Sequence, residues 1–386
     1  VKSRLMYIVP IALALSACAQ APATEDQAGA TRDSVQAGQL RIQRQVLAPA
    51  LYELALSKRQ DALFVVSAGG QSEKGESSKV LRLDPRTLAV QAEIPLERKG
   101  FGVALDDAAD RLYVGNGLDA SITVIDTRSN QVIAIIQLAR KIQARGMDGK
   151  LEERYAHSLR ELVLDTRNHR LYAPGAWFTD SALYVVDTRA LALERVLPGF
   201  GFLAAGVTLD HSGDVLYVSN LQGQLHRVDT RSLTVERVIE TGGDQLLNLA
   251  FDRKQSRILA TDQGEALIDG MRKEQGGLDY QRRGEGHRVV VMDAATGALL
   301  RSLPAGKGPV ALLLDPDRER LYVTSRESGQ VQVYDSRRYE LLQTVSLPTH
   351  PNSLALDGRS GDLYVSVKNG RDQPKGSPES VVRLSF

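Results

Sequence analysis

The sequence predicts an all-β protein, a seven-bladed β-propeller in which an N-terminal strand closes the last blade. Three observations predict this fold. A strand-like phrase of the type Leu-Tyr-Val occurs seven times, and a second phrase that ends in Asp follows six of these copies. Where no insertion intervenes, equivalent aspartates are 42 residues apart, as are Asp84 and Asp126, or Asp293 and Asp335. A period in the forties with several short β-runs per unit is typical of propeller blades.

The first eighteen residues have the features of a targeting segment. Lys2 and Arg4 precede an apolar run of 11 residues, Leu5 to Leu15, whereas a bilayer span needs about 20. The run ends in Leu-Ser-Ala-Cys, which is the pattern of a bacterial lipobox, and Cys18 is the only cysteine of the sequence. We therefore expect residues 1–18 to be a lipoprotein signal peptide with Cys18 as the lipidation site. The alternative is a secretory signal with an incidental cysteine.

Residues 19–39 are rich in Ala, Gln, Thr, Asp and Gly and hold almost no large apolar side chain. This composition predicts a flexible tether between the lipid and the folded body. Ala19 stands where an Asp would resemble an inner-membrane retention signal. We therefore expect the protein on the periplasmic side of the outer membrane of a Gram-negative bacterium, in contact with the membrane through its lipid anchor only.

One repeat shows the four strands of a blade most clearly. Pro309 to Leu314 is a continuous apolar run, suited to an inner strand that is buried on both faces. Asp315 to Glu319 forms a turn, and Arg320 to Ser325 is the second strand. Gln330 to Tyr334 alternates as a third strand, and Tyr339 to Leu347 is the outer one. The aspartate that ends each third strand is expected to cap the next turn with its own carboxylate.

The last repeat lacks an outer strand, because the chain ends with the third strand, Val381 to Ser385. The segment Leu40 to Leu47 alternates apolar and polar residues ahead of the first inner strand. It can complete the seventh blade and so remove an open sheet edge. We therefore assign residues 40–386 to one propeller and expect a monomer.

Two of the repeats carry a more specific pattern, Leu-Tyr-Val-x-Asn, at residues 112–116 and 216–220. This pattern resembles the YVTN repeat of the YncE-like propeller family, and the resemblance covers about residues 40–386. The resemblance implies an exported seven-bladed propeller. Because single-stranded DNA binding has been proposed within this family, it also implies DNA binding as one possible function. The chain departs from the pattern at residues 258–262, where the tyrosine is absent, and in its lipobox.

The connections between strands are unequal in length. Turns between strands one and two, and between three and four, are short. The turns that emerge on the other face carry every insertion: Gly69 to Lys79, Ala139 to Arg160, Ala176 to Ala182, Gly264 to Arg288 and Lys368 to Ser380. Loop growth on one face is how propellers build a binding surface, so we place the function there, at the mouth of the central channel.

Two insertions are rich in charge. Residues 140–160 are expected to hold a short helix from Leu151 to Leu159. Residues 271–288 include Arg282 and Arg283 with Tyr280 among them. Either these are solvated loops, or they form a local basic rim that contacts phosphates, with Tyr280 and Trp177 as stacking platforms. Without Lys2 and Arg4 the chain has 46 basic and 47 acidic residues, so such a rim would act only locally.

The turns between blades supply further candidates for ligand contact at the channel mouth. They are Lys99, Phe101, His157, Arg160, Phe200, Phe202, Lys307 and His350. Glycines beside them allow a ligand to approach the backbone closely. The alternative is that these glycines only permit the turns and that the aromatic side chains close the top of the barrel.

Motifs of catalysis are missing from the sequence. The six histidines show no spacing of a metal site, and there is no GxSxG elbow, P-loop, haem-attachment motif or thiolate nucleophile. We therefore predict no metal and no cofactor. The sequence favours a binding or scaffold protein for an envelope protein or ligand over an enzyme. Single-stranded nucleic-acid binding and a propeller hydrolase or lactonase are the alternatives.

Overall fold

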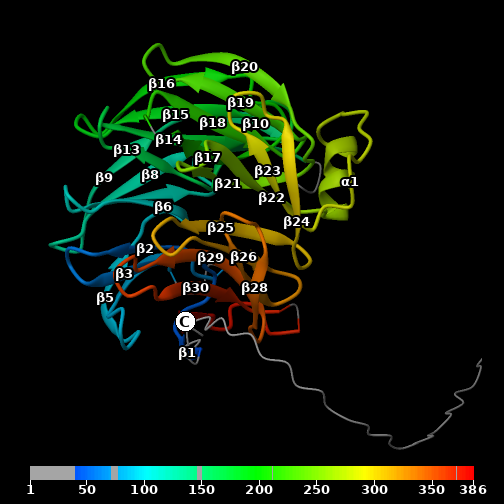
Figure 1. Cartoon of the computed structure of the whole chain (residues 1–386). Coiled ribbons are helices and arrows are strands. Elements are labelled where there is room, and N and C mark those ends of the chain that lie inside the picture. The colour runs from blue at the N-terminus through cyan, green and yellow to red at the C-terminus, as the bar shows by residue number, and fades with distance from the viewer. Residues whose placement is uncertain (1–39, 71–76, 146–149, 211, 371) are drawn as a thin grey trace, which may run out of the picture. The chain divides into compact units, whose positions relative to one another are not determined.

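The computed structural model describes residues 40–70, 77–145, 150–210, 212–370 and 372–386. The predicted signal peptide, Cys18 and the tether lie outside the described residues. From Gln39 to Phe386 the chain forms one compact unit of seven antiparallel β-sheets arranged as propeller blades (Figure 1). The predicted fold class is confirmed.

Six blades are runs of consecutive strands, and blade seven combines three C-terminal strands with β1; the strands of each blade are given from the channel outwards. Blade one has β2 (Leu51–Ser57), β3 (Ala62–Ser67), β4 (Lys79–Leu83) and β5 (Val90–Pro95), and blade two has β6 (Gly100–Asp106), β7 (Arg111–Asn116), β8 (Ser121–Asp126) and β9 (Gln131–Gln137). Blade three has β12 (Ser158–Leu159), β13 (Val163–Asp165), β14 (Arg170–Ala176), β15 (Ala182–Asp187) and β16 (Ala192–Pro198), and blade four has β17 (Ala204–Leu209), β18 (Val215–Asn220), β19 (Gln224–Asp229) and β20 (Thr234–Glu240). Blade five has β21 (Leu246–Asp252), β22 (Arg257–Asp262), β23 (Arg288–Asp293) and β24 (Leu299–Pro304), blade six has β25 (Pro309–Asp315), β26 (Arg320–Ser325), β27 (Gln330–Asp335) and β28 (Leu341–Ser346), and blade seven has β29 (His350–Leu356), β30 (Leu363–Lys368), β31 (Ser380–Ser385) and β1 (Arg41–Val46).

Blade seven is closed by a strand from the other end of the unit. β1 pairs antiparallel with β31, from Arg41 opposite Ser385 to Val46 opposite Ser380, and Figure 1 shows the blue β1 beside the C-terminus. β1 therefore removes the free edge that β31 would otherwise expose. The predicted closure of the last blade is confirmed.

Neighbouring blades pack face to face through apolar side chains of their middle strands. β3 shows the pattern, because all six of its residues are buried. One cluster joins Leu51 and Leu63 of blade one to Ala355 and Tyr364 of blade seven, and β29 packs against β2. The ring is thereby closed by hydrophobic contact as well as by β1.

The recurrent aspartates cap turns, as the sequence predicts. Asp126 Oδ1 accepts hydrogen bonds from the backbone N–H groups of Arg128 (3.0 Å) and Ser129 (2.8 Å), and Asp229 does the same two blades later. These backbone hydrogen bonds hold the pKa of Asp126 and Asp229 below the usual value. The short-turn face thus repeats one local chemistry from blade to blade.

The insertion after blade two is a hairpin, so the prediction of a helix from Leu151 to Leu159 is wrong. β10 (Lys141–Arg145) pairs antiparallel with β11 (Leu151–Tyr155). The Lys141 ammonium lies 5.7 Å from the ring of Tyr155. Pairing satisfies the backbone of both segments at once, whereas an isolated helix of two turns is marginal in water.

The insertion in blade five holds α1 (Ala266–Glu274), the one helix of the described residues and an element with no counterpart among the predicted ones. Among those residues, no helix is long and apolar enough to cross a membrane.

Candidate functional site

The inner strands present equivalent side chains to the channel, because their pairings share one register. In blade one Leu51 and Leu54 pair with β3, and the two residues between them have no partner in that strand. The inner strands of the other blades have unpaired residues at the equivalent positions, apart from small local differences. These two positions define two rings. The second-position ring is Tyr52, Phe101, Arg160, Ala205, Leu247, Val310 and Asn352, and the third-position ring is Glu53, Gly102, Glu161, Gly206, Asn248, Ala311 and Ser353.

The third-position side chains point toward the channel axis. Asn248 Nδ2 of blade five donates a hydrogen bond to Glu161 Oε1 of blade three, across the blade between them. Glu161 Oε2 accepts a second hydrogen bond from the backbone N–H of Val207, 3.0 Å away. Burial, reinforced by the charge of Glu53, raises the pKa of Glu161 well above its usual value. Glu161 is therefore harder to ionise than an exposed carboxyl group.

Glu53 occupies the corresponding place in blade one. Its Oε2 accepts a hydrogen bond from the backbone N–H of Val103, 2.9 Å away in blade two. Burial raises its pKa to about 7, against the lowering effects of that hydrogen bond and of Arg160. Both glutamates are half-buried by solvent accessibility, because they face the channel rather than the core. Glu53 thus changes its charge within the physiological pH range.

Four side chains of the mouth stack in a row across four blades, which we call the mouth ladder. The Arg160 guanidinium lies 6.0 Å from the ring centroid of Phe101. The Phe101 ring stacks on Tyr52 at 3.9 Å, and the Lys368 ammonium lies 3.8 Å from the Tyr52 ring. Lys368 also forms an ion pair with Glu379 (3.2 Å). The cation–π and ring contacts hold Arg160 and the two aromatic rings in fixed orientation.

A pocket of about 340 Å³ opens over blades two to five, at the end of the ladder that holds Phe101 and Arg160. Its walls are mostly apolar, with Phe101, Leu118 and Trp177 among them, and Arg160 and His157 contribute polar groups. Burial lowers the pKa of His157, and its Nδ1 lies 2.5 Å from Tyr184 Oη. An apolar pocket of a few hundred cubic ångströms with a few polar groups is the usual form of a small-molecule site. We call it the mouth pocket.

Part of the mouth packs against α1. Ile268 and Met271 of the helix pack on Ala205, Leu247 and Val310, which are the apolar members of the second-position ring. The helix therefore packs against the apolar part of the mouth, although Ala205 and Leu247 also line the mouth pocket, and it leaves Arg160 at the pocket wall.

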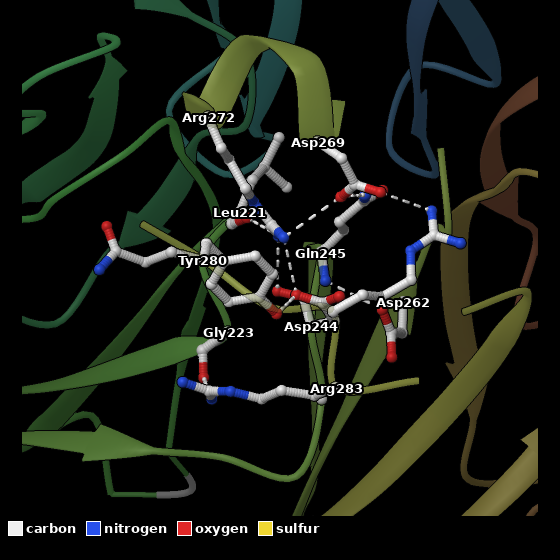
Figure 2. Close-up of polar contacts among 12 residues, drawn as sticks. Leu221, Gly223, Asp244, Gln245, Asp262, Asp269, Arg272, Tyr280 and Arg283 are labelled. Atoms are coloured by element: carbon white, nitrogen blue, oxygen red, sulfur yellow. Dashed lines mark hydrogen bonds and ion pairs between the residues drawn. The ribbon is translucent and has the colours of Figure 1, made fainter. Parts of the chain in front are cut away.

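The helix is held by a buried cation. The side chain of Arg272 is fully buried, and its Nη1 forms an ion pair with Asp244 Oδ1 (2.9 Å). Figure 2 shows this guanidinium between Asp244, Asp269 and the ring of Tyr280, whose centroid is 4.0 Å away. Tyr280 Oη also donates a hydrogen bond to Asp244. We call Arg272, Asp244 and Tyr280 the helix lock, because together they fix the insertion to blades four and five.

The predicted basic rim is engaged within the protein. Arg283 donates to the carbonyl oxygen of Gly223 (Figure 2). It also donates to the carbonyl oxygen of Thr241 and pairs with Glu240. Arg282 pairs with Asp269 (2.9 Å). Tyr280 belongs to the helix lock. Ligand contact by Arg282, Arg283 and Tyr280 stays a prediction, and each of these groups would give up a partner to make it.

The other predicted residues fall into three groups. Phe101, His157, Arg160 and Trp177 meet in the mouth pocket. Phe200 and Phe202 are buried, the first against His226 and the second among the side chains around α1. Lys99, Lys307 and His350 lie apart from the pocket. Lys99 donates to the carbonyl oxygen of Gly70 (2.9 Å), Lys307 is exposed, and His350 donates to the carbonyl oxygen of Arg326 (2.7 Å).

Several residues of the site are absent from the sequence prediction. They are Tyr52, Glu53, Glu161, Asn248, Arg326 and Lys368. For Glu53 and Glu161 a signal is visible once the seven inner strands are aligned, because the other blades have glycine, alanine, serine or asparagine at that position. A glutamate in an apolar inner strand marks a channel position.

Within the described residues no group of three or more His, Cys, Asp or Glu side chains is arranged to hold a metal ion.

A seven-bladed β-propeller with a ligand-sized pocket at its channel mouth is the class of protein that the fold and the site define. By sequence the chain belongs to the YncE family of propellers. It is 31% identical over 347 residues to the uncharacterized protein YncE of Salmonella typhimurium, covering 89% of this chain and 90% of the relative. The Escherichia coli K12 protein is 30% identical over 350 residues, with the same coverage.

One solved structure extends the comparison to the fold. Hydrazine synthase of Kuenenia stuttgartiensis aligns with a TM-score of 0.64 and 18% identity, over 82% of this chain and 92% of that one. At this identity the likeness concerns the fold alone. No family model matches the sequence.

Proposed function

We propose that the protein is a binding protein that recognises its ligand in the mouth pocket, on the face that carries the insertions. The observation that carries the proposal is the pocket itself, about 340 Å³ lined mostly by apolar side chains, with Arg160 at its wall. Insertions frame it, because Tyr155 and Trp177 come from the connections after blade two and within blade three. Pockets of this kind bury most of the surface of a small ligand.

The pocket can be blocked without disturbing the fold. At Gly117 an added Cβ would meet Phe101 at 3.6 Å, an ordinary van der Waals contact, and the backbone φ there is not positive. Gly117→Leu therefore places a side chain against the pocket wall. Gly270 of α1 has open space around it, so Gly270→Leu is a matched control that adds the same side chain elsewhere.

The test is isothermal titration with 2-naphthol and 2-naphthoate as small apolar probes. We expect at least one probe to bind the wild type and Gly270→Leu with one-to-one stoichiometry, and to bind Gly117→Leu at least tenfold more weakly. Equal binding to all three proteins, or binding to none, would contradict the proposal.

We further propose that the protein acts in the cell envelope, attached through lipid on Cys18 at the periplasmic side of the outer membrane. The lipobox pattern that ends at Cys18 supports this. Labelling with a radioactive fatty acid, followed by membrane fractionation of the wild type and Cys18→Ala, tests it. Label in the wild type alone is expected, and label in both or in neither protein contradicts it.

A further inference from the structure

The inference concerns two arginines at the mouth that have no counterion. Within the described residues the guanidinium of Arg160 makes no hydrogen bond or ion pair, and the same holds for that of Arg326, whose Nε is buried without a partner. Most arginines of the molecule behave differently. Arg154, at the rim of the same pocket, pairs with Glu152 (3.0 Å). Unpaired guanidinium groups in a half-buried setting are costly, so their presence calls for an explanation.

Arg326 reaches the channel mouth from blade six. Its backbone is fixed at the end of β26, where the N–H donates to the Gly308 carbonyl (2.8 Å). Its charge acts on groups of three other blades. Burial lowers the pKa of Arg160 and of Lys368, and Arg326 lowers both further. The pKa of Tyr52 is raised by burial and by Glu379, and Arg326 opposes that rise. The Arg326 charge therefore acts on the mouth ladder, although Arg326 does not line the mouth pocket.

The acidic groups nearby do not neutralise these two cations. Glu379 is committed to Lys368, to the backbone N–H of Leu51 (2.6 Å) and to that of Asn369. Burial raises the pKa of Glu161 well above its usual value and that of Glu53 to about 7, so both carry less negative charge near neutral pH than exposed carboxylates would. Burial also lowers the pKa of His157. The pocket wall thus holds the Arg160 cation without an ion-pair partner among the described residues.

We propose that the mouth pocket takes a monoanion with an apolar body, whose acid group binds Arg160 at the pocket wall and whose body lies against Phe101, Leu118 and Trp177. Arg326 does not line the pocket and contributes its positive charge from beside it. The inference rests on the proposed function and adds the chemical class of the ligand. A planar carboxylate matches the guanidinium fork. The apolar walls match the body, and the ladder keeps Arg160 in place before the ligand arrives.

The charge requirement is tested with 2-naphthoate and its neutral analogue 2-naphthamide, which have the same body. We expect 2-naphthoate to bind the wild type about tenfold to a hundredfold more tightly at pH 6, since a hydrogen bond to a charged group is worth that much. Arg160→Gln should remove most of this preference, and Arg326→Gln, whose charge lies beside the pocket, should remove a smaller part. Arg154→Gln, which deletes a paired cation at the same rim, should leave it nearly unchanged. Circular dichroism melting checks that all variants fold.

Further measurements distinguish between classes of anionic ligand, and between failure of the anion proposal and failure of the proposed function. Decanoate against 2-naphthoate distinguishes an aliphatic from an aromatic ligand, and tight binding of inorganic phosphate alone would overturn the need for an apolar body. If 2-naphthamide binds as well as 2-naphthoate and both are lost in Gly117→Leu, the anion proposal fails and the proposed function stands. If no probe binds, both fail.

The pH dependence gives a second readout. Above pH 7 Glu53 adds a negative charge beside Arg160, so the affinity for 2-naphthoate should fall several-fold between pH 6 and pH 8.5. Glu53→Gln keeps an oxygen for the Val103 N–H and should remove this fall. A fall that persists unchanged in Glu53→Gln would overturn the role of Glu53.

Discussion

The two halves of the channel mouth are built from the same positions of the same repeated strand and yet differ in chemistry. Over blades four to six the second-position ring is Ala205, Leu247 and Val310, and α1 packs against it. Over blades one to three it is Tyr52, Phe101 and Arg160, which remain partly accessible. The half that α1 contacts keeps its cation, Arg272, fully buried and paired with Asp244, and the other, open half keeps Arg160 unpaired. The comparison teaches that a cation which serves the fold has its partners within the chain, whereas one that serves a ligand lacks them.

The largest expected effect comes from blade seven, which borders the open half. A chain that begins at Leu47 lacks β1, and the unpaired β31 then exposes its edge. We expect a loss on the order of several kcal/mol in the free energy of unfolding, because a six-residue strand pairing disappears. Urea denaturation measures this loss, with a chain that begins at Leu40 as the control. Equal stability of the two chains would show that β1 does not close the ring.

The contrast between the two cations is tested by the same substitution in each half. Arg272→Met leaves Asp244 buried without its counterion and should destabilise the protein by about 3–5 kcal/mol, and it should open residues 263–287 to protease. Arg160→Met breaks no ion pair and relieves repulsion by Arg326, so we expect a change within about 1 kcal/mol. Urea denaturation of both variants gives the comparison. Similar losses in the two would remove the distinction between the halves.

The open half should also make stability depend on pH. Glu53 has a pKa of about 7 in the folded protein, above its value in the unfolded chain, so the folded state binds more protons between these values. Its contribution to stability is therefore complete at acid pH and is lost as the pH rises through 7. After allowance for its solvent access, we expect a loss of about 1–2 kcal/mol. Melting temperatures from pH 5 to pH 8 measure the slope, which Glu53→Gln should flatten.

The smallest effect should be equal in the two halves. Asp126 of blade two and Asp229 of blade four cap identical turns on the opposite face. Replacement of either by Ala should cost about 0.5–1.5 kcal/mol, and Asn should restore part of it. Because their folded pKa values are lowered, this contribution is present above the unfolded pKa and disappears as the pH falls below it. Denaturation at pH 7 and pH 3 tests both points. Unequal losses would mean that the halves differ beyond the mouth.

The sequence predicts the fold well because the fold is a repeat. Local patterns recur in the Leu-Tyr-Val phrases and in the aspartates that follow them, and the segment ahead of Leu51 supplies the strand that the last repeat lacks. The insertions also lie on the predicted face, and Phe101, His157, Arg160 and Trp177 meet in one pocket.

The rest of the site depends on distant partners that no local pattern reveals. The engagement of Arg283 with Glu240 and the burial of Arg272 against Asp244 follow from how the blade-five insertion folds back. Glu53 and Glu161 become visible as a pair only when the register of the inner strands is known. The prediction of a helix from Leu151 fails because residues 151–155 form a strand that pairs with residues 141–145. That pairing, rather than local helix preference, decides the conformation of the segment.

The hydrogen bond between Asn248 and Glu161 has a mechanical consequence. Asn248 Nδ2 donates to Glu161 Oε1, while Asn248 Oδ1 is buried without a partner among the described residues. Because this bond joins blade three to blade five and bypasses blade four, it braces the bore of the propeller from within, in addition to the packing between neighbouring blades.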